Sequence, residues 1–143
     1  MSAKDYLQQA FVLQSLIKAK QARIVQLQEM QGFVGIRQTG TKVQAGRRRD
    51  PLGDVSATLL DLISECRRDI LRLLAVQRRI KSLIETLPAP EHRLILFERY
   101  VNLKRWEDIA ADNGYSLRHL HRIHTASLTD LEDGIECHCL DMV

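Results

Sequence analysis

The stretch RYVNLKRWEDIAADNGYSLRHLHRIH, residues 99–124, holds two short helical patterns joined by very few residues. Apolar residues at helical spacing predict a helix over residues 91–101. The tripeptide NLK then turns the chain into a second helix, which begins at residue 106 and ends at 112 or 113. A third pattern predicts a helix from residue 117 to about residue 131, so this part of the chain is expected to form three helices.

The junction between the last two helices has a specific chemistry. Gly114 suits a tight turn, because a residue without a Cβ accepts a positive φ. Ser116 stands where an N-cap residue accepts a hydrogen bond from a free backbone N–H of the following helix. A helix, a glycine turn and a capped helix at this spacing are typical of a helix-turn-helix.

The last predicted helix separates into two faces. At about 100° per residue, one arc of roughly 140° forms the predicted packed face. This face comprises Leu117, Leu120, Ile123, Leu128 and Leu131. The opposite side carries Arg118, Arg122, Thr125 and Thr129, with His119 and His121 on its flanks.

The polar face favours an anionic partner. No acidic residue occurs over residues 117–129, whereas a solvated helix of that length normally carries some. The helix N-terminus adds positive potential, and Arg118 or Arg122 could donate two hydrogen bonds to a guanine edge. The predicted DNA-binding residues are Ser116, Leu117, Arg118, His119, His121, Arg122, Thr125, Lys104 and Arg105.

An alternative stays open for this block. Acidic and basic residues are equal in number over residues 88–131, so the block is not a basic patch. A helix-turn-helix can also serve as a packing unit in proteins that bind no DNA. A protein-interaction or structural role is therefore the competing interpretation.

Two long helical patterns precede this block. The first, about residues 3–30, has apolar residues spaced three and four apart, and Lys20 is the exception, with its stem on the apolar surface and its ammonium in water. That seam contains Tyr6, Ala10, Leu13, Ile17, Ile24 and Leu27. The second runs over residues 55–87 with Val55, Leu59, Leu62, Cys66, Leu73, Val76, Ile80, Leu83 and Leu87, and Asp69 is its polar member.

These seams predict an antiparallel helical hairpin or coiled coil. A seam shared between two subunits is the alternative, and the two can coexist. Asp54 or Ser56 could cap the second helix, and the prolines of LPAP at residues 87–90 should end it.

The connection between the two long helices, about residues 32–54, is expected to be a polar loop. Its basic residues Lys42, Arg47, Arg48 and Arg49 could contact phosphates. A merely solvated loop is the simpler interpretation.

Composition limits the class of protein. The chain has 143 residues, 45% of them hydrophobic and 5% aromatic, which suits an all-α protein better than a sheet sandwich. The net charge of +3 permits a nucleic-acid partner without requiring one. No apolar run approaches the roughly 20 residues of a membrane span, and no signal peptide is evident, so a cytoplasmic location is expected.

Catalytic and metal sites are not predicted. Cys137, His138 and Cys139 lack the usual zinc-ligand spacing, and Cys66 falls on a core position. Phosphate-binding loops and nucleophile motifs are missing from the sequence, so neither an enzyme nor a cofactor is expected. The clustered histidines His92, His119, His121 and His124 have no acid partner by sequence pattern, and they raise the hypothesis of a pH-dependent affinity.

A family resemblance adds to these patterns. The pairs and motifs RY at residues 99–100, WEDIA at 106–110, GYS at 114–116 and Leu128 resemble region four of sigma-70 family factors. They are still more similar to the ArpU-like regulators of phage and prophage late genes, as is the layout of two long helices before the head. The resemblance implies sequence-specific binding of double-stranded DNA, transcription activation and contact with host RNA polymerase.

The sequence thus predicts a hairpin over residues 1–87, a helix-turn-helix domain over 88–134 and a flexible tail over 135–143. The first functional hypothesis is a DNA-binding transcription regulator of a bacterial host cell that forms homodimers or larger homo-oligomers. The second is a phage assembly, packaging or polymerase-adaptor protein whose coiled coil is the main interface.

Overall fold

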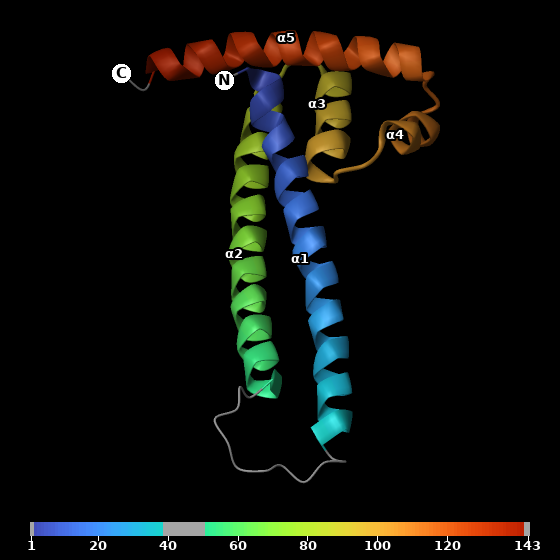
Figure 1. Cartoon of the computed structure of the whole chain (residues 1–143). Helices are drawn as coiled ribbons and strands as arrows, with labels where there is room; N and C mark the ends of the chain where they lie inside the picture. The colour runs from blue at the N-terminus through green and yellow to red at the C-terminus, as the bar shows by residue number, and fades with distance from the viewer. Residues whose placement is uncertain (1, 39–50, 142–143) are drawn as a thin grey trace. The chain divides into compact units, whose positions relative to one another are not determined.

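The computed structural model describes residues 2–38 and 51–141, with side chains described over residues 2–32 and 53–134. All regular elements in these ranges are helical, so the all-α prediction is confirmed (Figure 1). The elements are α1 (Ala3–Gln38), α2 (Pro51–Glu85), α3 (Pro90–Leu96), the π-helix η1 (Phe97–Val101), α4 (Trp106–Asn113) and α5 (Leu117–Asp141).

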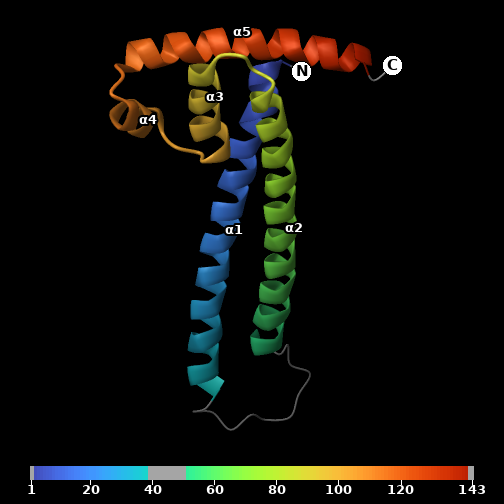
Figure 2. The same cartoon turned by 180° about the vertical axis from the view of Figure 1, so that it is seen from behind.

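The helices α1 and α2 form a long hairpin within one chain, followed by the shorter C-terminal helices (Figures 1 and 2). The chain divides into two compact units, one of residues 14–71 and one of residues 1–13 with 72–143. Among the described residues, no helix is both long and apolar enough to cross a membrane.

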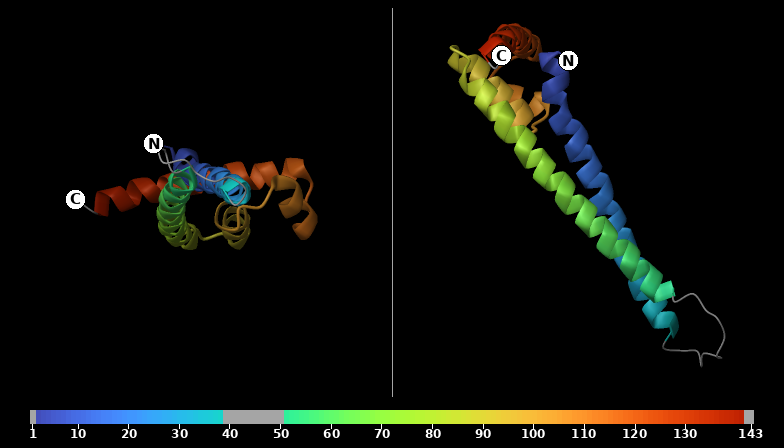
Figure 3. Two further views of the ribbon diagram at one scale, coloured as in Figure 1. Left: turned by 60° about the horizontal axis from the view of Figure 1, so that its bottom comes forward. Right: turned by 90° about the vertical axis from the view of Figure 1, so that its left-hand side faces the viewer.

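The unit of residues 14–71 contains most of α1 and the N-terminal part of α2. Its parts of α1 and α2 lie side by side in both views of Figure 3. Ile17 and Leu27 of α1 are buried, as are Leu59 and Cys66 of α2, all at predicted seam positions. The heptad pattern therefore identified the packed faces of both helices.

The two polar seam residues pair with each other. Lys20 Nζ forms an ion pair with the buried carboxylate of Asp69 and lies 3.5 Å from Glu65 Oε2. The hydrogen bond to Asp69 raises the pKa of Lys20, with further favourable charge from Glu65. The sequence placed this ammonium in water, and the structure adds an ion-pair partner for it, because a buried carboxylate needs a charged partner.

The loop between α1 and α2 is shorter than predicted. Helix α1 continues to Gln38, and α2 begins at Pro51, so Asp54 and Ser56 lie inside α2 and are not its caps. Proline fits the first helical position because the N–H that it lacks would have no intrahelical acceptor there. Glycine within a helix costs about 1 kcal/mol, which is too little to stop a long helix at Gly32.

The second unit contains the start of α1, the C-terminal part of α2 and the C-terminal helices. One buried cluster comprises Ala3, Leu7, Ala10, Ile80, Ile84, Leu87, Leu96, Tyr100 and Leu131. A second comprises Ile95, Ile109, Ala110, Leu120 and Ile123, with Trp106 and Tyr115 packed against it. The boundary predicted between residues 87 and 88 therefore does not match the observed division, since the first turns of α1 share a core with α5.

The C-terminal helix is longer than predicted. Helix α5 runs to Asp141, about ten residues beyond the expected end near Leu131 and through the region expected to form a flexible tail. Its sequence contains no proline, and Gly134 costs only about 1 kcal/mol within a helix, so nothing local ends the helix.

Candidate nucleic-acid interface

The turn between α4 and α5 has the geometry that the sequence predicts. Gly114 adopts φ 67° and ψ 27°, and the N–H of Tyr115 donates to the carbonyl of Ala110 at 3.0 Å. The Ser116 hydroxyl oxygen accepts a hydrogen bond from the N–H of His119 at 3.2 Å and so caps α5. Two short-range signals, a glycine C-cap and a serine N-cap, therefore fix where α4 ends and where α5 begins.

The buried face of α5 differs from the predicted one at three residues, Leu117, His124 and Ser127. Leu120, Ile123 and Leu131 are buried as predicted, whereas Leu117 is 44% exposed. A side chain in the first turn leans toward the helix N-terminus, past the region that is packed. His124 and Ser127 are buried instead, with the Ser127 hydroxyl donating to the carbonyl of Ile123 at 2.6 Å.

The predicted polar face of α5 is exposed. Arg118, His119, His121, Arg122, Thr125 and Thr129 all face solvent. A shallow hollow on this face is lined by Arg118, His121, Arg122, Thr125 and Ala126. The Thr125 hydroxyl donates to the His121 carbonyl at 2.9 Å, which leaves its oxygen free to accept a hydrogen bond. The structure thus brings together most of the predicted DNA-binding residues on one side of α5.

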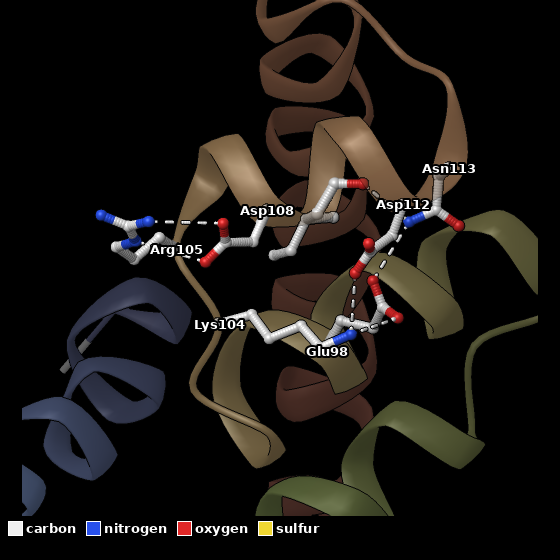
Figure 4. Close-up of polar contacts among 7 residues, drawn as sticks. Glu98, Lys104, Arg105, Asp108, Asp112 and Asn113 are labelled. Carbon is white, nitrogen blue, oxygen red and sulfur yellow. Dashed lines mark hydrogen bonds and ion pairs between the residues drawn. The ribbon is translucent and has the colours of Figure 1, made fainter.

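Lys104 and Arg105 have a different environment (Figure 4). Lys104 Nζ lies 3.3 Å from Glu98 Oε1 and 3.1 Å from Asp112 Oδ2, and Arg105 Nε lies 3.2 Å from Asp108 Oδ2. Hydrogen bonds to Asp112 and then Glu98 raise the pKa of Lys104. Because nearby acids already balance both charges, these two residues are weaker candidates for DNA contact than the sequence indicated.

The same contacts hold α4 to the preceding segment. The Asn113 side-chain amide donates to Glu98 Oε2 at 3.1 Å and to the Ile109 carbonyl at 2.9 Å (Figure 4). Glu98 therefore binds both ends of the segment from Lys104 to Asn113. Its spacing from Lys104 and Asn113 gave no periodic signal, which is why the sequence did not reveal this network.

Aromatic rings support the histidines at the edges of the exposed face. The rings of Trp106 and His121 have centroids 5.0 Å apart, and those of Tyr115 and His119 are also 5.0 Å apart. Such contacts restrict the imidazole rotamers, so these side chains are partly preorganised for a partner.

The other two histidines of the cluster are not on this face. His92 Nδ1 lies 2.9 Å from Asp130 Oδ2, an acid pairing that the sequence pattern did not show. His124 is buried, and its Nε2 shares a hydrogen bond of 2.8 Å with the Tyr100 hydroxyl. The hypothesis of a pH-dependent DNA affinity is therefore restricted to His119 and His121.

Burial sets the protonation state of the Tyr100–His124 pair. It raises the pKa of Tyr100 to about 12 and, with nearby positive charge from His121, Lys4 and Arg99, lowers the pKa of His124 to about 4. At neutral pH the tyrosine keeps its proton and the imidazole is uncharged. The pair is thus a neutral hydrogen bond within the core.

This pair predicts a loss of stability in acid. The pKa of His124 is about 6.5 when unfolded and about 4 when folded, so between these values the unfolded chain binds more protons. We expect the free energy of unfolding to fall on the order of 2 kcal/mol from pH 6.5 to pH 4 because of this residue. Urea unfolding of the wild type and of His124→Gln at several pH values measures the effect. An equal pH dependence in both proteins would contradict it.

Arg99 is a residue that the sequence did not single out beyond the RY motif. Its guanidinium lies between two rings, 4.2 Å from the centroid of Phe11 and 4.5 Å from that of Trp106. Its NH1 group donates to the Lys104 carbonyl at 2.8 Å, while its buried Nε has no hydrogen-bond partner. No ion pair to Arg99 occurs within the described part of the chain, and burial lowers the pKa of this residue.

The predicted phosphate-contacting loop and the possible metal ligands have the following positions. Lys42, Arg47, Arg48 and Arg49 lie outside the described residues, as do the side chains of Cys137, His138 and Cys139. Cys66 is a buried free thiol, as predicted. Over the side chains that the structure describes, no three His, Cys, Asp or Glu residues are grouped to hold a metal ion.

Comparison with known proteins gives no further assignment. No family model, no curated protein and no solved structure matches this chain.

Proposed function

We propose that this protein binds double-stranded DNA in a sequence-specific way and thereby regulates transcription. The observation that carries the proposal is the exposed side of α5 over residues 117–129, which holds no acidic residue and presents Arg118 and Arg122. The αL turn at Gly114 and the cap at Ser116 are the features expected of a helix-turn-helix, in which α4 supports α5 as the recognition helix.

The chemistry of this face suits the major groove. An arginine can donate two hydrogen bonds to the O6 and N7 acceptors of guanine, and Arg118 and Arg122 are one helical turn apart. The free N–H groups at the start of α5 suit a phosphate, which would orient the helix without reading sequence. The exposed side chain of Leu117 could contact a thymine methyl group beside them.

Selection of bound fragments from a fragmented phage or bacterial genome tests the proposal. At one stated salt concentration, the protein should enrich a discrete site. Equal recovery of all fragments would contradict sequence-specific reading.

The role as a late-gene activator of a phage or prophage, with contact to RNA polymerase, is proposed on the sequence resemblance alone. The residues of RY and WEDIA that carry the resemblance include Tyr100, Trp106 and Ile109, which have core or half-buried positions in the structure. Their positions support a similar fold more than they support a shared binding partner.

A second candidate function is an assembly, packaging or polymerase-adaptor protein. Asp108 and Asp112 of α4 pair with Arg105 and Lys104, and Glu107 is exposed beside them, which favours a protein partner over DNA on that side. The exposed leucines Leu60 and Leu71 of the hairpin also favour a protein partner. In this alternative, replacing Arg118 and Arg122 leaves assembly unchanged.

Self-association through the hairpin is part of both candidates. Leu60 and Leu71 of α2 are 65% and 66% exposed. They are eleven residues apart, which places them within about 20° on the helix surface. Two exposed leucines on one side of α2 are the observation that favours a homodimer or a larger oligomer.

We expect the Leu60→Gln, Leu71→Gln variant to lose self-association while keeping its helical content, because both side chains are exposed in the single chain. Sedimentation velocity of the variant and wild type measures this. A dimer of the wild type suits a regulator with two half-sites, and a ring of many subunits suits packaging. A monomeric wild type would contradict the oligomer.

A further inference from the structure

A hollow of about 450 Å³ lies beside α5, between its first turns and those of α1. Lys4 and Gln8 line it from α1, and Arg99 and Trp106 line it from η1 and α4. His121 lines it from α5.

The charge of this hollow is positive. Lys4 and Arg99 are both cationic, and no acidic residue lines the hollow. Within the described residues, neither of them forms an ion pair. The rings of Phe11 and Trp106 hold the guanidinium of Arg99 in place, so its charge is fixed without a counter-ion. A fixed positive hollow of this kind attracts an anion.

The position of the hollow indicates which anion it meets. His121 lines this hollow and also the shallow one that Arg118 and Arg122 form on the exposed face of α5. An anion bound by Lys4 is therefore adjacent to the edge of the face that would enter a groove. A helix in the major groove has phosphates of the duplex along its sides.

We propose that the first turns of α1 make a second contact with DNA, in which Lys4, together with Gln8 and His121, holds a backbone phosphodiester of the duplex that α5 reads. This inference rests on the proposed DNA binding. Lys4 and Gln8 are exposed and supply an ammonium and an amide donor, and the ring of His121 supplies an N–H. Arg99, which also lines the hollow, adds positive charge.

This contact has a specific energetic character. A phosphate contact strengthens binding to every sequence equally and releases counterions, so it appears in the salt dependence and not in base preference. Base contacts by Arg118 and Arg122 instead appear in the base preference, because they strengthen binding to the selected site over other sequences.

The experiment compares Lys4→Gln with Lys18→Gln, which removes the same charge from an exposed position further along α1. Affinity is measured for the selected site and for a random duplex at several salt concentrations. We expect Lys4→Gln to weaken both complexes by a similar factor of about ten and to reduce the slope of log K against log salt by about 0.9. Lys18→Gln and Lys4→Arg should resemble the wild type.

Each outcome decides a different claim. If Lys4→Gln keeps the wild-type slope, or weakens only the selected site, the α1 contact is wrong while DNA binding by α5 stands. If the wild type binds no duplex, both proposals fail. The fluorescence of Trp106, the single tryptophan of the chain, verifies that each variant folds.

Discussion

Replacing both Arg118 and Arg122 with alanine is expected to abolish enrichment of a discrete DNA site. Both side chains are exposed on α5, and each arginine–guanine pair contributes about 1 to 3 kcal/mol of discrimination. If the two contacts are independent, the double variant loses roughly 2 to 6 kcal/mol of specific binding. Selection of genomic fragments by the wild type and the variant, at the same salt concentration, measures the loss.

A matched control removes the same charge elsewhere. Arg78 and Arg79 are exposed on α2, so the Arg78→Ala, Arg79→Ala variant has the same net charge as the test variant. It should still enrich the site. If both double variants lose affinity equally for all sequences, the arginines act only through charge. If neither loses any, α5 is a structural helix and the partner is to be sought on the hairpin.

Replacing Leu7 with alanine is expected to lower the free energy of unfolding by about 2 to 5 kcal/mol. Leu7 is fully buried in the cluster that contains Leu96 and Leu131, so the change leaves a cavity against α3 and α5. Urea unfolding followed by the fluorescence of Trp106 measures the effect at α4, because that residue begins this helix.

The control for this prediction is Leu16→Ala, the same chemical change on the same helix. Leu16 is 46% exposed, so its replacement should alter stability by no more than about 0.5 kcal/mol. Equal effects of the two changes would show that the start of α1 is not part of the core with α5. In that case the predicted boundary between residues 87 and 88 would be restored.

Local patterns predicted most of the fold. The three-four spacing identified the buried seam of α2, including Leu59, Cys66 and Ile80, because burial on one side of a helix imposes its period on the sequence. Gly114 and Ser116 gave the turn between α4 and α5 because caps act over a few residues. Helix ends without such caps, at Gln38 and Asp141, were missed.

The candidate site was predictable to the same extent. Angular position alone placed Arg118, Arg122 and Thr125 on one exposed face. Angular position does not show which side chains of other elements lie nearby, so the pairing of Lys104 with Glu98 and Asp112 was not predicted.

The sequence by itself determined the helices, their apolar faces, the turn at Gly114 and the exposed arginines of α5, because each depends on residues close together in the chain. Only the tertiary structure decided that Lys20 meets Asp69, that His124 is a neutral core residue bonded to Tyr100, and that Lys4 lies beside α5. These relations join residues far apart in the sequence, and their energies depend on burial and distance, which no local period encodes.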